Sequence, residues 1–288
     1  MRHALVFGAS GQIGAPLLDR LERSGWRITA MSRSQHGDRP GLRWVRGDFD
    51  SAGELPHEAD VIFSCGPLDH FARWYARTPI DCPRVLAFGS TSIEVKRGSA
   101  DPEERAVAAR LREGEGMVFD TAAARGAQAT LLRPTLVYGA GRDHTLTRIA
   151  TLARRWGRFV LPRGACGKRQ PVHVGDLADA VFAACDAPAS HGNAYALPGG
   201  ETLPYRDMVA RVLSVLEPPP RLLEVPSPLF AAALLGARAL GRVGGFGDAA
   251  VARMRSDLVF DLAPAARDFG YAPRVFRPTA RMFETPGT

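Results

Sequence analysis

The sequence is poor in the features that mark several common protein classes. Its four cysteines stand singly, with no Cys-x-x-Cys pair, which argues against a structural zinc site and against a disulfide framework. The apolar stretch 229–240 is too short to span a bilayer and contains Arg238. The first apolar run begins at residue 3, leaving no room for the n-region of a signal peptide. We therefore expect a cytoplasmic protein with no metal and no membrane partner.

A clustered basic segment is also missing. The 37 lysines and arginines exceed the 30 aspartates and glutamates by seven, but the basic residues are spread along the chain without interleaved aromatics. Nucleic-acid-binding proteins carry a clustered footprint instead, so we expect no nucleic acid partner. A diffuse positive surface favours anionic cofactors and is compatible with an anionic small-molecule substrate.

Strand and helix patterns alternate over the first 140 residues, which predicts an α/β fold whose parallel sheet is covered on both faces. The expected strands are 3–7, 26–31, 42–46, 60–64, 84–88 and 128–133, with helices at 12–24 and 103–125 among others. Further along, the patterns predict helices at 143–156, 176–187 and 204–216 and a strand at 170–174. The apolar helix 229–240 suits either a buried position or a partner-facing surface.

These patterns divide the chain into two parts. We expect a nucleotide-binding domain over residues 1–165, to which 170–187 returns, and a smaller α/β lobe over 166–288 that mainly binds substrate. The sequence leaves the oligomeric state open, a homodimer included.

The strongest local motif is GASGQIG, residues 8–14, which follows a strand and opens a helix. In that setting Gly8 permits a tight turn, Gly11 lets the backbone approach a pyrophosphate, and Gly14 permits close packing of helix on strand. The free N–H groups at the helix N-terminus then face the phosphates. The motif predicts a dinucleotide site, whereas a glycine-rich turn without a ligand is the alternative.

The end of the second strand predicts which dinucleotide binds. An acidic residue there would bind the ribose 2′-hydroxyl of NAD, whereas a nearby arginine accommodates the 2′-phosphate of NADP. The segment 31–34 reads MSRS, with no carboxylate and with Arg33 available, which favours NADP(H) over NAD(H). Asp48, in GDFD, either accepts a hydrogen bond from the adenine amino group or caps a following helix.

An ordered set of motifs along nearly the whole chain resembles the extended short-chain dehydrogenase/reductase superfamily, specifically its NAD-dependent epimerase/dehydratase group. The set comprises GASGQIG, GDFD, VLAFGSTS, LLRPTLVYGAG, QPVHVGDLADAV, LPGGETLPYRDMV and AARDFGYAPRVF. The resemblance implies a Rossmann-type domain, a small C-terminal substrate lobe and a reaction pocket between them. It implies cofactor contacts from Gly8, Ser10, Gly11, Gln12, Ile13, Gly14, Arg33, Asp48, Phe49, Cys65, Gly66, Pro67 and Pro134.

The resemblance breaks at the catalytic residues. Such enzymes use a serine or threonine to hold the substrate oxygen and a Tyr-x-x-x-Lys pair to move the proton that accompanies hydride transfer. Ser90 occupies the first position, but Val107 and Leu111 stand where the tyrosine and lysine are expected. No alignment shift restores the pair, because no tyrosine lies between Tyr75 and Tyr138.

Several other groups are candidates for the missing proton donor. Tyr138 follows the sixth strand, where relatives line the pocket. In CGPLDHFARWY (65–75), the resemblance places Asp69, His70 and Tyr75 near the substrate, although a solvent-facing loop suits them equally. His173 is expected to pin a returning strand.

Two further expectations concern the segment around residue 170. Asp176 is expected to cap the helix that follows it. Lys168 and Arg169 suit either an anionic substrate or a solvated turn.

Two functions therefore stand. The first is an atypical oxidoreductase that acts on a small polar substrate, with Ser90 as the oxygen anchor and a non-standard proton donor. Reduction is favoured over epimerisation, since an epimerase must move the proton both to and from the substrate oxygen. The rival is a catalytically inactive dinucleotide sensor or accessory protein, as implied by relatives that lack the Tyr-x-x-x-Lys pair.

Overall fold

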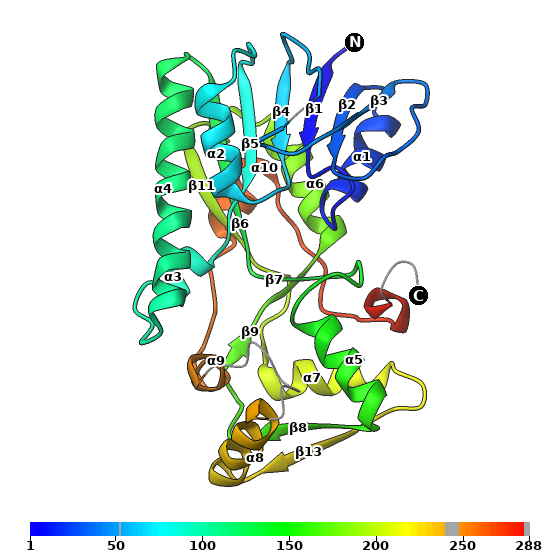
Figure 1. Cartoon of the computed structure of the whole chain (residues 1–288), viewed down its shortest axis with the longest axis vertical. Coiled ribbons are helices and arrows are strands. Elements are labelled where there is room, and N and C mark those ends of the chain that lie inside the picture. The colour runs from blue at the N-terminus through cyan, green and yellow to red at the C-terminus, as the bar shows by residue number, and fades with distance from the viewer. Residues whose placement is uncertain (52, 240–247, 285–288) are drawn as a thin grey trace. The chain divides into compact units, whose positions relative to one another are not determined.

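The computed structural model of the chain describes residues 1–51, 53–239 and 248–284, and these form two compact units (Figure 1). Unit 1 contains residues 1–135, 172–198 and 261–273, and unit 2 lies within 136–171, 199–260 and 274–288. Along the chain, the first passage from unit 1 to unit 2 follows Thr135. The segment 172–198 lies with the first unit.

Unit 1 is built on a seven-stranded sheet in the order β11-β6-β5-β4-β1-β2-β3, with parallel pairing between neighbours. Every residue of β1, β4 and β5 is buried, as expected for strands covered on both faces. The strands are β1 His3–Phe7, β2 Arg27–Ser32, β3 Leu42–Arg46, β4 Val61–Ser64, β5 Arg84–Phe88, β6 Gln128–Pro134 and β11 Asn193–Leu197. The predicted doubly wound parallel sheet is confirmed.

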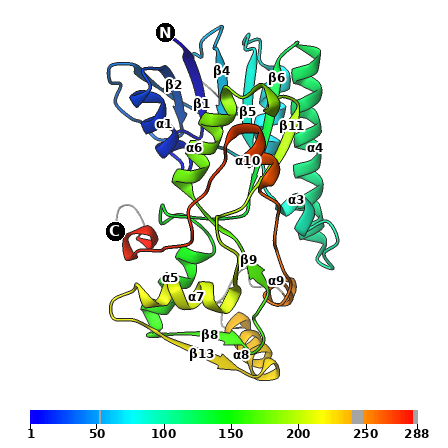
Figure 2. The same cartoon turned by 180° about the vertical axis from the view of Figure 1, so that it is seen from behind.

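Helices cover both faces of this sheet. In the two opposite views α2 and α4 lie on one face, and α1, α6 and α10 lie on the other (Figures 1 and 2). Their bounds are α1 Gly14–Arg23, α2 Leu68–Arg77, α3 Ser92–Val95, α4 Pro102–Ala124, α6 Val174–Cys185, η1 Pro188–Ser190 and α10 Ala263–Phe269. The long helix α4 has a strong start, because the Asp101 side chain accepts a hydrogen bond from the Glu103 amide and Pro102 occupies the first turn.

Unit 2 packs α5 and α7 around an apolar core that includes Tyr138, Leu161, Met208 and Phe276. Its elements are β7 Leu136–Tyr138, α5 Leu146–Trp156, β8 Arg158–Pro162, β9 Lys168–Arg169, β12 Leu203–Pro204, α7 Tyr205–Ser214, β13 Arg221–Val225, α8 Ser227–Ala239, α9 Asp248–Arg253 and η2 Ala280–Phe283. Strand β10, Pro171–His173, spans the boundary between the units.

Local hydrogen bonds explain why α5 and α6 begin at other residues than the sequence predicted. Helix α6 begins at Val174, because His173 Nδ1 accepts the Gly175 amide at 3.0 Å. The prediction that Asp176 caps this helix is therefore wrong, and Asp176 lies buried in the first turn. Helix α5 begins three residues later than predicted, after Asp143 Oδ1 accepts the Leu146 amide.

The apolar helix predicted at 229–240 is α8, with residue 240 outside the described residues. Leu229 and Leu235 are each 63% exposed, so a buried position is wrong for these two side chains.

Candidate functional site

The turn after β1 is shaped by backbone contacts that only glycine allows. Gly8 has a φ of +66°, and a Cβ there would lie 2.9 Å from the carbonyl carbon of Cys65. A Cβ on Gly14 would lie 2.2 Å from the carbonyl oxygen of Gly8, well inside van der Waals contact. Gly11 closes the turn by donating its amide to that oxygen at 2.9 Å. The turn thus holds the start of α1 against the end of β1.

The start of α1 has the properties of an anion site. No side chain caps its first turn, and no acidic residue lies there. Ile13 stands directly before the helix and is buried. In the same turn, Gln12 Oε1 is buried and has no hydrogen-bond partner, which costs free energy unless a ligand supplies a donor. The turn therefore fits a dinucleotide, whose phosphates suit the free N–H groups.

A hydroxyl stands at the end of β2, where NAD-binding chains carry a carboxylate. Ser32 is buried, and its Oγ lies 2.8 Å from Ser10 Oγ and 3.2 Å from His36 Nε2. It also accepts the Ser34 amide at 3.2 Å. Arg33 follows it with an exposed side chain. Ser32 and His36 were not predicted as site residues; the serine at the end of a predicted strand was the available signal.

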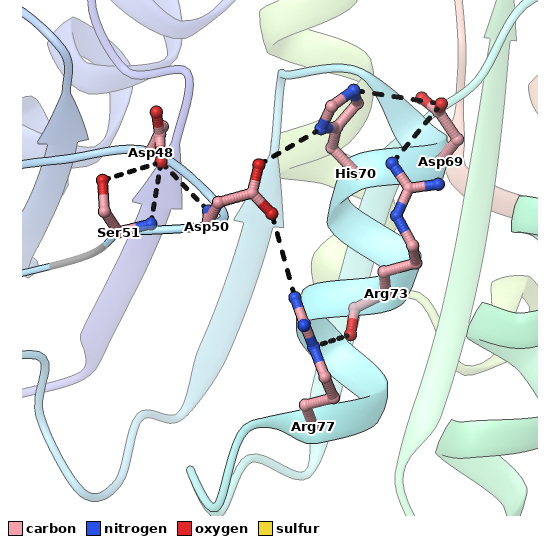
Figure 3. Close-up of polar contacts among 7 residues, drawn as sticks. All are labelled: Asp48, Asp50, Ser51, Asp69, His70, Arg73 and Arg77. Carbon is pink, nitrogen blue, oxygen red and sulfur yellow. Dashed lines mark hydrogen bonds and ion pairs between the residues drawn. The ribbon is translucent and has the colours of Figure 1, made fainter.

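Asp48 organises the loop after β3. Its Oδ1 accepts hydrogen bonds from the Asp50 amide at 3.0 Å and from the Ser51 amide at 2.8 Å (Figure 3). These bonds and the Ser51 hydroxyl lower the pKa of Asp48, and the positive charge of Arg33 lowers it further. The described residues between Gly47 and Pro67 contain no helix, so the alternative that Asp48 caps one is wrong.

The predicted residues Phe49, Cys65, Gly66 and Pro67 come together beside β1. The Phe49 ring stacks on Phe7 with centroids 5.1 Å apart, and a Cβ on Gly66 would lie 2.9 Å from the Phe49 ring. Burial raises the pKa of the Cys65 thiol to about 12, which keeps it protonated and unsuited to nucleophilic attack. Pro67 immediately precedes α2.

Charged side chains link the loop after β3 to α2. His70 lies 3.9 Å from Asp50 and 4.0 Å from Asp69, while Arg77 reaches Asp50 at 3.9 Å (Figure 3). Polar contacts this long between exposed side chains contribute little energy.

Tyr75, on the same helix, is 1% exposed and its ring stacks on Phe71 in the core, so it does not face a pocket. Burial raises the pKa of its hydroxyl to about 12.

The ends of β5 and β6 are tied together next to Ser90. Gly89 donates its amide to the Leu132 carbonyl at 2.8 Å, and Thr91 Oγ1 donates to the Pro134 carbonyl at 3.1 Å. Ser90 is half-buried, and its Oγ accepts the Ser92 amide at 3.1 Å. Its hydroxyl hydrogen thus remains available for another acceptor.

A buried ion pair fixes α4 against β6. Arg133 Nε donates to Glu115 Oε1 at 2.8 Å and its Nη2 to Oε2 at 2.5 Å, which raises the pKa of Arg133. A Cβ on Gly89 would lie only 3.0 Å from Glu115 Oε1. Leu111 and Val107 lie one and two turns before Glu115 and are half-buried. Helix α4 contains no tyrosine and no lysine.

The remaining candidates lie in unit 2. Tyr138 belongs to unit 2, where it is 1% exposed and meets the Phe276 ring edge-on at 4.9 Å. Arg169 is buried and donates to the carbonyls of Lys168 and Ser256. Lys168 is exposed and lies 4.0 Å from Asp257.

Comparisons with known proteins agree with this geometry. The profile of the NAD dependent epimerase/dehydratase family matches residues 4–84 and 98–197. The chain is 25% identical to 2-alkyl-3-oxoalkanoate reductase of Stenotrophomonas maltophilia, over 94% of each chain. It is 24% identical to NADH dehydrogenase [ubiquinone] 1 alpha subcomplex subunit 9 of Arabidopsis thaliana, over 78% of this chain and 61% of that protein.

Solved structures share the fold. The crystal structure of UDP-glucuronic acid 4-epimerase from Bacillus cereus in complex with NAD superposes with a TM-score of 0.71 at 12% identity, over 98% of this chain and 94% of that one. Because the family profile covers well over half of the sequence and the glycine turn fits a dinucleotide, the chain belongs to the NAD dependent epimerase/dehydratase family.

Proposed function

We propose that the protein is an atypical NADP(H)-dependent oxidoreductase that reduces a carbonyl group of a small polar substrate. Ser90 anchors the substrate oxygen, and the proton comes from a group other than the usual tyrosine. The observation that carries the proposal is the arrangement around Ser32, where a hydroxyl and Arg33 replace the carboxylate that would select NAD.

Residues of unit 1 support this proposal for the pyrophosphate, the 2′-phosphate and the adenine of a dinucleotide. The glycine turn and the free amides of α1 suit the pyrophosphate. The buried Gln12 Oε1 has no hydrogen-bond donor of its own and could accept one from the cofactor. Ser34, Ser10 and the Arg33 guanidinium suit the 2′-phosphate. Asp48 is a carboxylate whose pKa is lowered by the hydrogen bonds of its loop, and its oxygens can accept a hydrogen bond from an adenine amino group.

The chemistry requires a proton to follow the hydride. A bound nicotinamide supplies or takes up the hydride, and the substrate oxygen must exchange a proton at the same time. The Ser90 hydroxyl can donate a hydrogen bond to that oxygen, because the Ser92 amide occupies only one of its lone pairs and leaves its hydrogen for another acceptor. Val107 and Leu111 cannot donate a proton, so the donor lies elsewhere, on the protein or on the substrate.

The substrate class follows from charge and from the named relative. The net charge of +7 favours an anionic substrate. The relative from Stenotrophomonas is named a reductase of 2-alkyl-3-oxoalkanoates, which are carboxylates with a nearby ketone. We therefore propose a 3-oxo acid as the first substrate class to test, with nucleotide sugars as the comparison set.

Cofactor titration tests the proposal. We expect NADPH to bind more tightly than NADH when nicotinamide fluorescence is followed, and Arg33→Ala to weaken NADPH binding on the order of 10-fold while leaving NADH unchanged. Arg23→Ala, an exposed arginine at the far end of α1, is the matched control. Equal binding of both cofactors by the unaltered protein would remove the role of Arg33, and no binding of either would overturn the proposal.

A dinucleotide-sensing or accessory role is the second candidate. It is favoured by the absence of tyrosine and lysine from α4 and by the relative named as a subunit of mitochondrial NADH dehydrogenase. The two functions differ in turnover. NADPH oxidation with a 3-oxo acid that is lost in Ser90→Ala supports the enzyme, whereas tight NADPH binding without turnover across both substrate sets supports the sensor.

A further inference from the structure

Helix α8 of unit 2 is apolar over most of its length, and several of its side chains are exposed. The sequence from Pro228 to Ala237, PLFAAALLGA, contains no polar side chain. Leu229 and Leu235 are nevertheless each 63% exposed, and Ala231 and Ala232 are exposed as well. A helix that is hydrophobic all round is normally buried in protein or in lipid. Leu229, Ala231, Ala232 and Leu235 therefore lack the cover expected for such a helix among the described residues.

The parallel pair of β8 and β13, of which β13 directly precedes α8, continues the apolar surface. In the parallel pair of β8 and β13, Val160 lies beside Leu223, which is 38% exposed. The neighbouring pair, Phe159 and Leu222, packs into the core of unit 2. Both views place α8, β8 and β13 together at one end of this unit (Figures 1 and 2).

Exposed arginines surround this surface. Arg158 and Arg221 are paired first residues of the two strands, and like charges side by side repel. Trp156, just before β8, is 47% exposed. At the other end of the strands Arg255 donates to Ser227 Oγ, at the start of α8. We define the basic rim as Arg155, Arg158, Arg163, Arg221 and Arg255, all of them exposed.

No carboxylate among the described residues lies within ion-pair distance of the basic rim. Glu224 of β13 pairs with Arg206 at 2.6 Å, and Asp257 lies beside Lys168. Glu217, in the loop before β13, is exposed, and the rim keeps an excess of positive charge. A partner for this surface needs both negative charge for the arginines and an apolar region for the leucines and the tryptophan.

The positive charge of the basic rim, together with the apolar side chains, distinguishes three possible partners: a second copy of this chain, a nucleic acid and a bilayer. In a symmetric contact with a second copy of this chain, the basic rims would be brought near each other, which is unfavourable. A nucleic acid would pair with the arginines but gains nothing from alanine and leucine side chains. An anionic bilayer satisfies both, because arginines attract its headgroups while tryptophan and leucine suit the boundary with the acyl chains.

We propose that α8, Leu223, Trp156 and the basic rim dock unit 2 on the surface of an anionic phospholipid bilayer. The contact is peripheral, since no helix among the described residues is both long and apolar enough to cross a membrane. It revises the expectation of no membrane partner and does not depend on the proposed reaction.

Vesicle co-sedimentation of the full-length protein tests this proposal. We expect binding to vesicles of equal parts phosphatidylcholine and phosphatidylglycerol, weaker binding to phosphatidylcholine alone, and release by high salt. The double variant Leu229→Glu/Leu235→Glu should lose at least ~10-fold in affinity. The triple variant Arg155→Ala/Arg158→Ala/Arg221→Ala should lose on the order of 100-fold.

Controls separate docking from folding. Arg110→Ala/Arg112→Ala, which removes two exposed arginines of α4 in unit 1, should bind as the unaltered protein does. Vesicles should shift tryptophan emission to the blue in the unaltered protein but not in Trp156→Phe. Thermal melting followed by circular dichroism shows that each variant is folded.

Three outcomes would overturn the proposal. The first is failure of the unaltered protein to bind the mixed vesicles. The second is self-association without lipid that Leu229→Glu/Leu235→Glu abolishes, which would assign the surface to a second copy. The third is retention on polyglutamate that matches the vesicles and ignores the leucine variants, which would assign an acidic protein.

Discussion

The turn after β1 and helix α4 both contribute to the candidate site, and they differ in what constrains them. In the turn, Gly8 and Gly14 are fixed by backbone atoms within 2.9 Å and 2.2 Å of where a Cβ would stand. In α4, Glu115 is fixed by Arg133, whereas Leu111 packs against the apolar core of unit 1 and Val107 is half-buried. Packing therefore preserves the cofactor-binding half, whereas nothing in the fold requires a particular chemistry two turns before Glu115.

The largest effect is expected from a glycine-to-alanine substitution, made in one variant in the turn after β1 and in a second variant in α4. Gly14→Ala forces a Cβ against the Gly8 carbonyl oxygen, and we expect a loss of about 4 kcal/mol in the free energy of unfolding. Gly116→Ala, at an exposed position of α4 where an added Cβ meets open space, should stabilise by about 0.5–1 kcal/mol. Urea unfolding of both variants measures the contrast. Equal effects would mean that the turn is not constrained as described.

The ion pair of α4 gives the next effect. Glu115→Ala removes two charge-assisted hydrogen bonds from Arg133, which is 22% exposed and keeps Glu94 at 3.3 Å, so we expect a loss of about 1.5–3 kcal/mol. Glu113→Ala, exposed two residues earlier, should change stability by less than about 0.5 kcal/mol. Thermal unfolding compares the two. A small effect for Glu115→Ala would show that α4 is positioned by its apolar contacts alone.

Introducing the missing tyrosine and lysine into α4 tests whether this helix can support proton transfer. If α4 has the register fixed by Glu115, then Val107→Tyr/Leu111→Lys should raise kcat with a reducible substrate by ~10-fold or more, because a positioned acid contributes 10²–10⁴-fold. Val107→Phe/Leu111→Met adds similar bulk without a proton and should not. The rate of NADPH oxidation reports both. No gain in kcat with intact NADPH binding would place the proton donor of this protein elsewhere.

The smallest effect concerns Asp48. Its pKa is lowered in the folded protein, so its contribution to stability is present above the pKa of the unfolded chain, about 3.9. That contribution is lost as the pH falls through the folded pKa. Asp48→Asn should therefore reduce Tm at neutral pH slightly and flatten its decline in acid. A Tm difference that does not change between neutral pH and pH about 3 would contradict this.

The sequence predicted features that depend on local pattern. The alternation of strands and helices gave the parallel sheet, and the spacing of Gly8, Gly11 and Gly14 gave the turn. It did not predict that His173 rather than Asp176 caps α6, because both are suitable residues and only the chain's path selects between them. Ser32 was missed as a centre of hydrogen bonds, since Ser10 and His36 reach it from separate segments.

The exposure of α8 could not be predicted from the local sequence pattern either. The apolar run identified a helix but could not show whether another segment covers it. Burial is a property of tertiary contacts, and the exposure of Leu229 and Leu235 appears only when the chain is folded.

The order of segments in unit 1 has a consequence for biosynthesis. The sheet ends at β11, whose residues 193–197 pair with β6 and are made some sixty residues after it. Until they leave the ribosome, β6 presents an unpaired edge, which is a template for intermolecular pairing. A nascent chain that stalls between the two strands should therefore need chaperone protection, and truncation before Leu197 should yield aggregates rather than a smaller folded protein.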